Sequence, residues 1–171
     1  MGEVNKPALF ERTIVPHLDA AYNLARWLTR SEQDAEDVVQ EAYLRAFRFF
    51  DGFDPAAGGD GKAWLLAIVR NTCMTWLRGK GGVVEFNEQV HRVADAVPSA
   101  EDALVKHGDI ASLRDCVEAL PAEYRAIIVM REMEELSYRE ISEVAGVPIG
   151  TVMSRLSRGR VRLLECMEKK R

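Results

Sequence analysis

The stretch that most constrains the fold spans residues 136–162, which have the pattern of a helix, a tight turn and a second, basic helix. Ser137 followed by Glu140 predicts a capping box, in which each side chain satisfies a free amide at the start of the first helix. Gly146 suits the end of that helix, because a left-handed conformation is accessible without a β-carbon. Pro148 suits the first turn of the next helix. The pattern predicts a helix-turn-helix, whose second helix enters the major groove of DNA.

The second helix of this stretch combines an apolar side with a basic side. Residues 149–171 hold seven basic and two acidic residues. A helical hairpin with a merely solvated basic face is the alternative interpretation. The capping box, the turn glycine and the Gly150-Thr151 opening together favour DNA binding. We expect Val152, Leu156, Val161 and Leu164 to be buried, and Ser154, Arg155, Arg158, Arg160 and Arg162 to lie on the opposite side.

Charge is distributed unevenly along the 171 residues, although the formal net charge is only −4. Residues 31–54 hold seven acidic residues and two arginines, the reverse of the C-terminal helix. An acidic segment and a basic segment in one chain suggest two different partners. The negative total is unusual for a protein that binds DNA unaided.

The cysteines and histidines predict neither a disulfide framework nor a metal site. Cys73, Cys116 and Cys166 are isolated, odd in number and not arranged in CxxC pairs. The three histidines are equally scattered and show no metal-ligand spacing. We therefore expect no metal and no cofactor.

The start of the chain lacks the apolar core of a signal peptide. The longest apolar run, residues 63–69, is far too short to span a bilayer. We expect a cytoplasmic protein that makes no membrane insertion of its own.

The N-terminal part has the periodicity of two amphipathic helices. Residues 8–30 form the first, with Pro16 marking a kink or a helix start. The second begins after Ser31, a good N-cap, and has apolar residues along one stripe. Its outer face is acidic with Leu44 at its centre. Composition alone favours a solvated face there, and a surface for a basic partner helix is the alternative.

Residues 53–61 are predicted to form a loop, and residues 62–80 an amphipathic, basic helix. That helix contains Trp64 and Trp76 and four basic residues without an acid. Basic side chains with interleaved aromatic rings suit an unpaired nucleic-acid strand. Both tryptophans could instead belong to the core; this interpretation is favoured for Trp64 and is evenly balanced for Trp76.

The pattern as a whole predicts an all-α protein with two small helical domains joined by a flexible linker. The domains would cover residues 1–80 and 108–171, with the linker at residues 81–107. In the second domain, a helix from about residue 109 and another over residues 122–134 would support the helix-turn-helix. Their core residues would be Ile110, Leu113, Val117, Leu120, Tyr124, Ile127, Ile128 and Met130.

Three motifs in this order resemble the extracytoplasmic-function (ECF) group of the sigma-70 family, the promoter-recognition subunits of bacterial RNA polymerase. The helix that binds core polymerase is resembled by residues 34–54, DAEDVVQEAYLRAFRFFDGFD. The −10 element helix is resembled by residues 64–78, WLLAIVRNTCMTWLR. The −35 element domain is resembled by residues 120–160, LPAEYRAIIVMREMEELSYREISEVAGVPIGTVMSRLSRGR. The match covers nearly the whole chain.

The resemblance implies a sigma factor, not an enzyme, that binds core polymerase and promoter DNA and promotes DNA melting. An anti-sigma factor is a further expected partner. The implied core-polymerase contacts are Asp37, Gln40, Glu41, Leu44 and Arg48. Those to the −10 element are Phe53, Asp54, Lys62, Trp64, Arg70, Asn71, Thr75, Trp76 and Arg78. Those to the −35 element are Arg139, Gly150, Thr151, Met153, Ser154, Arg155, Arg158 and Arg160.

Two positions depart from the family pattern. An aspartate is usual where Thr75 stands, and a lysine or arginine is usual where Met153 stands. Methionine cannot donate a bidentate hydrogen bond to guanine. The alternative functions are a two-domain helix-turn-helix regulator that is not a sigma subunit, and a sigma-like protein that binds polymerase without opening DNA.

Overall fold

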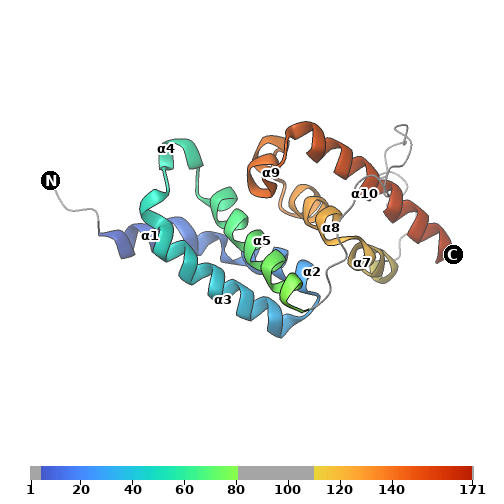
Figure 1. Cartoon of the computed structure of the whole chain (residues 1–171), viewed down its shortest axis with the longest axis horizontal. Helices are drawn as coiled ribbons and strands as arrows, with labels where there is room; N and C mark the ends of the chain where they lie inside the picture. The colour runs from blue at the N-terminus through green and yellow to red at the C-terminus, as the bar shows by residue number, and fades with distance from the viewer. Residues whose placement is uncertain (1–4, 81–109, 171) are drawn as a thin grey trace.

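The computed structural model describes residues 5–80 and 110–170, and within these ranges the chain forms helices and no strands. Two groups of helices lie side by side, one from each half of the chain (Figure 1). The predicted all-α fold is thus confirmed. The linker expected at residues 81–107 lies outside the described residues. No helix in the described parts combines the length and the apolar character needed to cross a membrane.

The first group is built on three helices that pack against one another, α2, α3 and α5. Pro16 lies in a short 3₁₀ turn that separates α1 from α2, because proline lacks the N–H that a continuous helix would use. Phe10, Leu24, Leu28 and Leu66 are fully buried between the helices. The elements are α1 (Lys6–Ile14), η1 (Val15–His17), α2 (Leu18–Thr29), α3 (Glu32–Phe49), η2 (Phe50–Gly52), α4 (Pro55–Gly58) and α5 (Lys62–Gly79).

Helix α3 begins and is buried as its sequence predicts. The Ser31 side chain accepts a hydrogen bond from the Asp34 backbone amide at 3.3 Å, which caps the helix. Its inward stripe contains three alanines, Ala35, Ala42 and Ala46, each fully buried. These small side chains allow α3 to lie close to α2 and α5.

The segment predicted as a loop, residues 53–61, is partly helical. Asp54 caps the single turn α4 by accepting a hydrogen bond from the Ala56 amide at 2.9 Å. Gly61 then begins α5 with a φ of 92°, which favours glycine. A β-carbon on Gly61 would lie 2.8 Å from Thr13 Cγ2, so this glycine lets α5 start directly against α1.

The second group contains the predicted helix-turn-helix. Its core includes Tyr124, Ile127, Met130, Val152 and Leu156. The regular helix expected over residues 122–134 ends at Ile128, and the chain continues from Val129 to Met133 as a π-helical segment. Two buried positions were predicted wrongly: Ile110 is 77% exposed, and Leu163 is buried in place of its neighbour Leu164. The elements are α7 (Ile110–Ala119), α8 (Ala122–Ile128), η3 (Val129–Met133), α9 (Tyr138–Ala145) and α10 (Ile149–Lys169).

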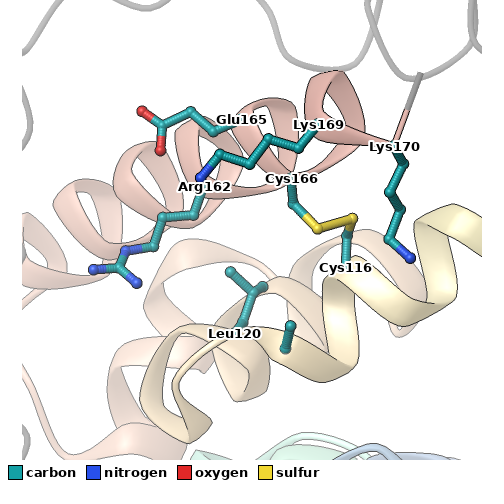
Figure 2. Close-up of a pocket in the computed structure, with 8 residues that line it drawn as sticks. Cys116, Leu120, Arg162, Glu165, Cys166, Lys169 and Lys170 are labelled. Atoms are coloured by element: carbon teal, nitrogen blue, oxygen red, sulfur yellow. A yellow bond between two sulfur atoms is a disulfide. The ribbon is translucent and has the colours of Figure 1, made fainter.

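A disulfide bond joins Cys116 of α7 to Cys166 of α10 (Figure 2). The expectation that the cysteines form no disulfide was therefore wrong. The two residues are 50 positions apart, and only the antiparallel packing of α7 on α10 brings their sulfur atoms together. Cys73 is free and buried in the first group.

The two groups also pack against each other, mainly α5 against α9 and α2 against α8. Arg125 of α8 is almost fully buried and donates to the Leu28 carbonyl at 3.1 Å in α2. It also donates to the carbonyls of Glu118 and Leu120, at 3.0 and 2.7 Å. Burial lowers the pKa of Arg125 to about 10, but this value is still well above neutral pH, so the guanidinium stays charged. The charged side chain binds both helical groups.

Candidate polymerase-binding and DNA-binding surfaces

The outer face of α3 is an exposed, largely polar stripe with Leu44 at its centre, and Phe47 is exposed beside it. Leu44 is 60% exposed, although its helix neighbours Ala42 and Ala46 are fully buried. Glu41 and Arg45 form an ion pair at 2.6 Å along the edge of this face. The predicted polymerase contacts Asp37, Gln40, Glu41, Leu44 and Arg48 are all exposed on this one helix.

Helix α5 presents a second exposed stripe, formed by Asn71, Thr75 and Arg78 at spacings of four and three residues. The Thr75 hydroxyl donates to the Asn71 backbone carbonyl at 3.0 Å, and the exposed Asn71 side chain accepts a hydrogen bond from Arg70 at 3.3 Å through its Oδ1. Trp76 is half-buried beside it, with the Lys80 ammonium 4.7 Å from its ring centre. This stripe can offer amide, hydroxyl and guanidinium groups to an unpaired strand.

Cys73 lies on the opposite, buried side of α5 and has no chemical role at the surface. Its burial raises the pKa of the thiol to about 12, a shift that nearby Arg125 only partly offsets. The thiol therefore stays protonated at neutral pH, and a protonated thiol is a poor nucleophile.

Phe53 and Trp64, predicted to touch the −10 element, belong to an aromatic cluster beside the start of α5. Their ring centres lie 5.3 Å apart, and Phe50 stacks on Phe53 at 5.6 Å. Phe50 and Phe53 also line a groove of about 250 Å³, together with Lys6 and Asp51. Trp64 is thus partly core, as composition favoured. The exposed Asp54 carboxylate caps α4 at the edge of this region.

Lys62 and Arg70 point from α5 towards acidic residues of the second group. The Lys62 ammonium lies 3.3 Å from the Glu134 carboxylate and donates to the Glu134 carbonyl at 2.9 Å. Arg70 pairs with Glu123 at 2.7 Å. Both cations are thus engaged within the chain. The local sequence around these two glutamates gives no sign of the pairs, because their partners are more than 50 positions away.

The helix-turn-helix has the predicted local geometry. Both hydrogen bonds of the Ser137–Glu140 capping box are present, each at 3.1 Å. Gly146 ends α9 with a φ of 67°. The Ser142 hydroxyl donates to the Val147 carbonyl at 2.6 Å and thereby fixes the turn. Arg139 lies on the exposed side of α9 and pairs loosely with Glu143.

The predicted DNA contacts on α10 differ in how exposed they are. Ile149, Gly150 and Met153 are exposed, whereas Thr151, Ser154 and Arg158 are half-buried. The nearest partner of Arg160 is Glu132 of η3. Arg155 differs from the expectation of an outward side chain, because it is only 8% exposed and lies 3.5 Å from Glu123. Glu123 therefore bridges Arg155 of α10 and Arg70 of α5.

Comparison with known families matches both halves of the chain. A model of sigma-70 region 2 covers residues 13–82, and a model of sigma-70 region 4 covers residues 110–163. The ECF RNA polymerase sigma factor SigW of Bacillus subtilis is 32% identical over 152 residues, which cover 83% of this chain and 80% of the relative. This chain belongs to the ECF sigma factors.

Two other relatives of this sigma factor show similar identity. The RNA polymerase sigma-E factor of Streptomyces avermitilis is 32% identical, over 93% of this chain and 85% of the relative. ECF sigma factor SigE of Mycolicibacterium smegmatis is 33% identical over 94% of this chain, but the match spans only 62% of that longer protein.

A solved structure of similar fold is the sigma factor RpoE from Bartonella quintana in complex with the anti-sigma factor NepR. Its TM-score is 0.70 at 29% identity, with 95% of this chain and 98% of that chain covered. CnrH in complex with the cytosolic domain of CnrY has a TM-score of 0.68 at 22% identity, with 96% and 91% covered, and this likeness concerns the fold alone.

Proposed function

We propose that this sigma factor binds core RNA polymerase through the outer face of α3, the −10 element through α5 and the −35 element through α10. It acts in the cytoplasm by binding and not by catalysis. The observation that carries the proposal is the α3 stripe, where the exposed Leu44 lies among polar side chains and the opposite side of the helix is packed through buried alanines. An apolar centre with a charged rim is the usual anatomy of a protein interface.

Melting of the −10 element follows from differential binding. A surface shifts the balance between paired and unpaired DNA only by its difference in affinity for the two forms. The Asn71, Thr75 and Arg78 stripe can hold one strand, and the groove beside Phe50 and Phe53 offers aromatic faces to an unstacked base. Binding there must offset the few kcal/mol that unstacking costs.

The −35 element would be held by α10 and the turn before it. The backbone amides of Ile149 and Gly150 at the start of α10 suit a DNA phosphate, because the helix dipole adds to their attraction. The next amide, that of Thr151, already donates to the Pro148 carbonyl at 2.9 Å, so the Thr151 hydroxyl is the group left for a phosphate. A net charge of −4 makes unaided DNA binding weak. Core polymerase would hold both domains at the promoter, so that binding of one raises the effective concentration of the other.

The packing of the two domains bears on regulation. Lys62 pairs with Glu134, and Arg70 pairs with Glu123. Two of the cations proposed to bind the −10 element are therefore already paired with carboxylates of the second domain. We therefore expect the domains to separate when the protein binds promoter DNA. The similarity to a sigma factor solved with its anti-sigma factor supports an anti-sigma factor as a further partner.

The test combines Leu44→Ala with Gln40→Ala. Loss of the Leu44 side chain removes about 1.5–3 kcal/mol of apolar burial in the complex, so we expect core binding to weaken at least about tenfold. The melting temperature should stay unchanged, because both side chains are exposed. Core affinity and initiation on linear duplex promoters are the measurements, and Arg12→Ala, an exposed change on α1, is the control.

Two outcomes separate the parts of this proposal. If the double variant binds core as tightly as the unchanged chain, the α3 surface is assigned wrongly. If core polymerase with the unchanged chain starts no transcripts on any promoter, the sigma function itself is refuted.

A further inference from the structure

The exposed start of α10, the second helix of the helix-turn-helix, is apolar. Met153 is 53% exposed and Ile149 is 44% exposed. They are four residues apart on one helix, so their side chains share a face. The adjacent Val152 and Leu156 are buried in the domain core and fix the rotation of α10. Ile149 and Met153 therefore face outward at the part of the helix that enters a major groove.

The polar side chains nearest to Met153 are less available for base contacts. The Ser154 hydroxyl donates to the Thr151 carbonyl at 3.1 Å. Arg155 is buried beside Glu123. Over residues 149–158, only Ile149, Gly150 and Met153 are exposed, and none of these has a polar side chain. Base contacts at this site therefore fall first to apolar groups.

We propose that Met153, with Ile149 beside it, recognises the C5-methyl groups of thymines in the −35 element. The inference rests on the proposed binding of α10 to that element. A methionine donates no hydrogen bond, and its thioether adapts its shape to apolar neighbours. Among the base edges of the major groove, thymine alone presents a methyl group. Met153 therefore selects thymine at a position where an arginine or lysine would select guanine.

The experiment removes single methyl groups from the DNA. Core polymerase with this chain first selects its preferred −35 element from a randomised promoter library. Each thymine in that element is then replaced with deoxyuridine, which keeps the base pair and lacks only the C5-methyl. We expect about fourfold weaker binding at one or two positions, corresponding to one buried methyl group each. The Met153→Ala variant should bind the two DNAs equally.

Three controls keep the result specific. Met133→Ala removes another exposed methionine of the same domain, located in η3, and should retain the preference for thymine over deoxyuridine. Replacing thymines between the −35 and −10 elements should have no effect. Met153→Ala should keep the fold, because alanine and methionine both favour helices, and thermal unfolding checks this.

Normal initiation without methyl sensitivity at any −35 thymine would overturn this inference and leave the sigma function intact. The same holds if the preferred element contains no thymine, or if the deoxyuridine penalty persists in Met153→Ala. A loss of binding to a protein partner in Met153→Ala, with the thymine preference unchanged, would assign this apolar face to that partner instead. Failure to initiate at all would instead refute the proposed function.

Discussion

Gly159 sets the distance between α10 and α8. A β-carbon there would lie 3.1 Å from Ile128 Cγ1 and 3.7 Å from Tyr124 Cβ, so only a glycine allows this close packing without a shift. We expect Gly159→Leu to push α10 away from α8 and to lower the free energy of unfolding by about 1–3 kcal/mol. Urea denaturation measures the change.

Gly150 provides the matched control on the same helix. A β-carbon at Gly150 would meet nothing within 4 Å, so Gly150→Leu should leave the packing of α10 unchanged. An equal loss of stability in both variants would mean that the leucine acts through the helix itself and not through contact with Ile128.

Single residues differ in how well the sequence predicts them. The capping box of Ser137 and Glu140 and the turn at Gly146 were predicted correctly, because each depends on neighbours within a few positions. Arg155 was expected to face outward but is buried. It adjoins Leu156 at the edge of the apolar stripe, and its partner Glu123 lies 32 positions earlier. Helical periodicity contains no information about that distant partner.

At the scale of elements, the disulfide ties the C-terminal part of α10 to α7 (Figure 2). A bond across 50 residues restricts the unfolded chain, which typically stabilises the folded state by about 2–4 kcal/mol. We expect reduction with dithiothreitol to lower the free energy of unfolding of the second domain by this amount. Denaturation of the oxidised and reduced protein measures the difference.

Two cysteine variants test that explanation. Cys116→Ala should unfold at the same denaturant concentration with and without reductant, because it can form no bond to Cys166. Cys73→Ala keeps the disulfide and should retain the full difference. A redox effect that survives in Cys116→Ala would show that another group is responsible.

The π-helical segment η3 shows where prediction of elements fails. Periodicity predicted a regular helix over residues 122–134, but the Glu134 amide donates to the Val129 carbonyl, five residues earlier, at 3.1 Å. Met130, within this wider turn, and Leu136, shortly after it, are both buried. The extra residue lets both side chains reach the core, a tertiary requirement that the local pattern does not contain.

At the scale of the whole molecule, three motifs in order sufficed to predict an all-α chain with two helical groups. How the groups pack on each other could not be predicted. Arg125 binds the Leu28 carbonyl across 97 positions, and Lys62 and Arg70 pair with Glu134 and Glu123. Each of these contacts joins residues that lie far apart in the sequence. The sequence predicted Lys62 and Arg70 as DNA contacts but gave no sign of the acidic groups that pair with them.

The Glu123 carboxylate holds the two domains together at a point where both have a predicted DNA contact. It lies 2.7 Å from Arg70 and 3.5 Å from Arg155. Replacing it by Glu123→Gln keeps the shape but removes a charge-assisted interaction, which is typically worth about 1.5–3 kcal/mol. The contact between the two domains competes with DNA for Arg70. We therefore expect the free Glu123→Gln variant to bind a single-stranded −10 oligonucleotide up to about tenfold more tightly than the unchanged chain does.

Fluorescence anisotropy of a labelled oligonucleotide measures this affinity, and Asp115→Asn is the matched control. Asp115 pairs with Lys170 at 3.1 Å inside the second domain, so Asp115→Asn changes the net charge equally without touching the contact between domains. If both variants bind more tightly by the same factor, net charge alone explains the gain. If only Glu123→Gln does, the carboxylate competes with DNA for Arg70, and the two domains must part before the promoter can be held by both.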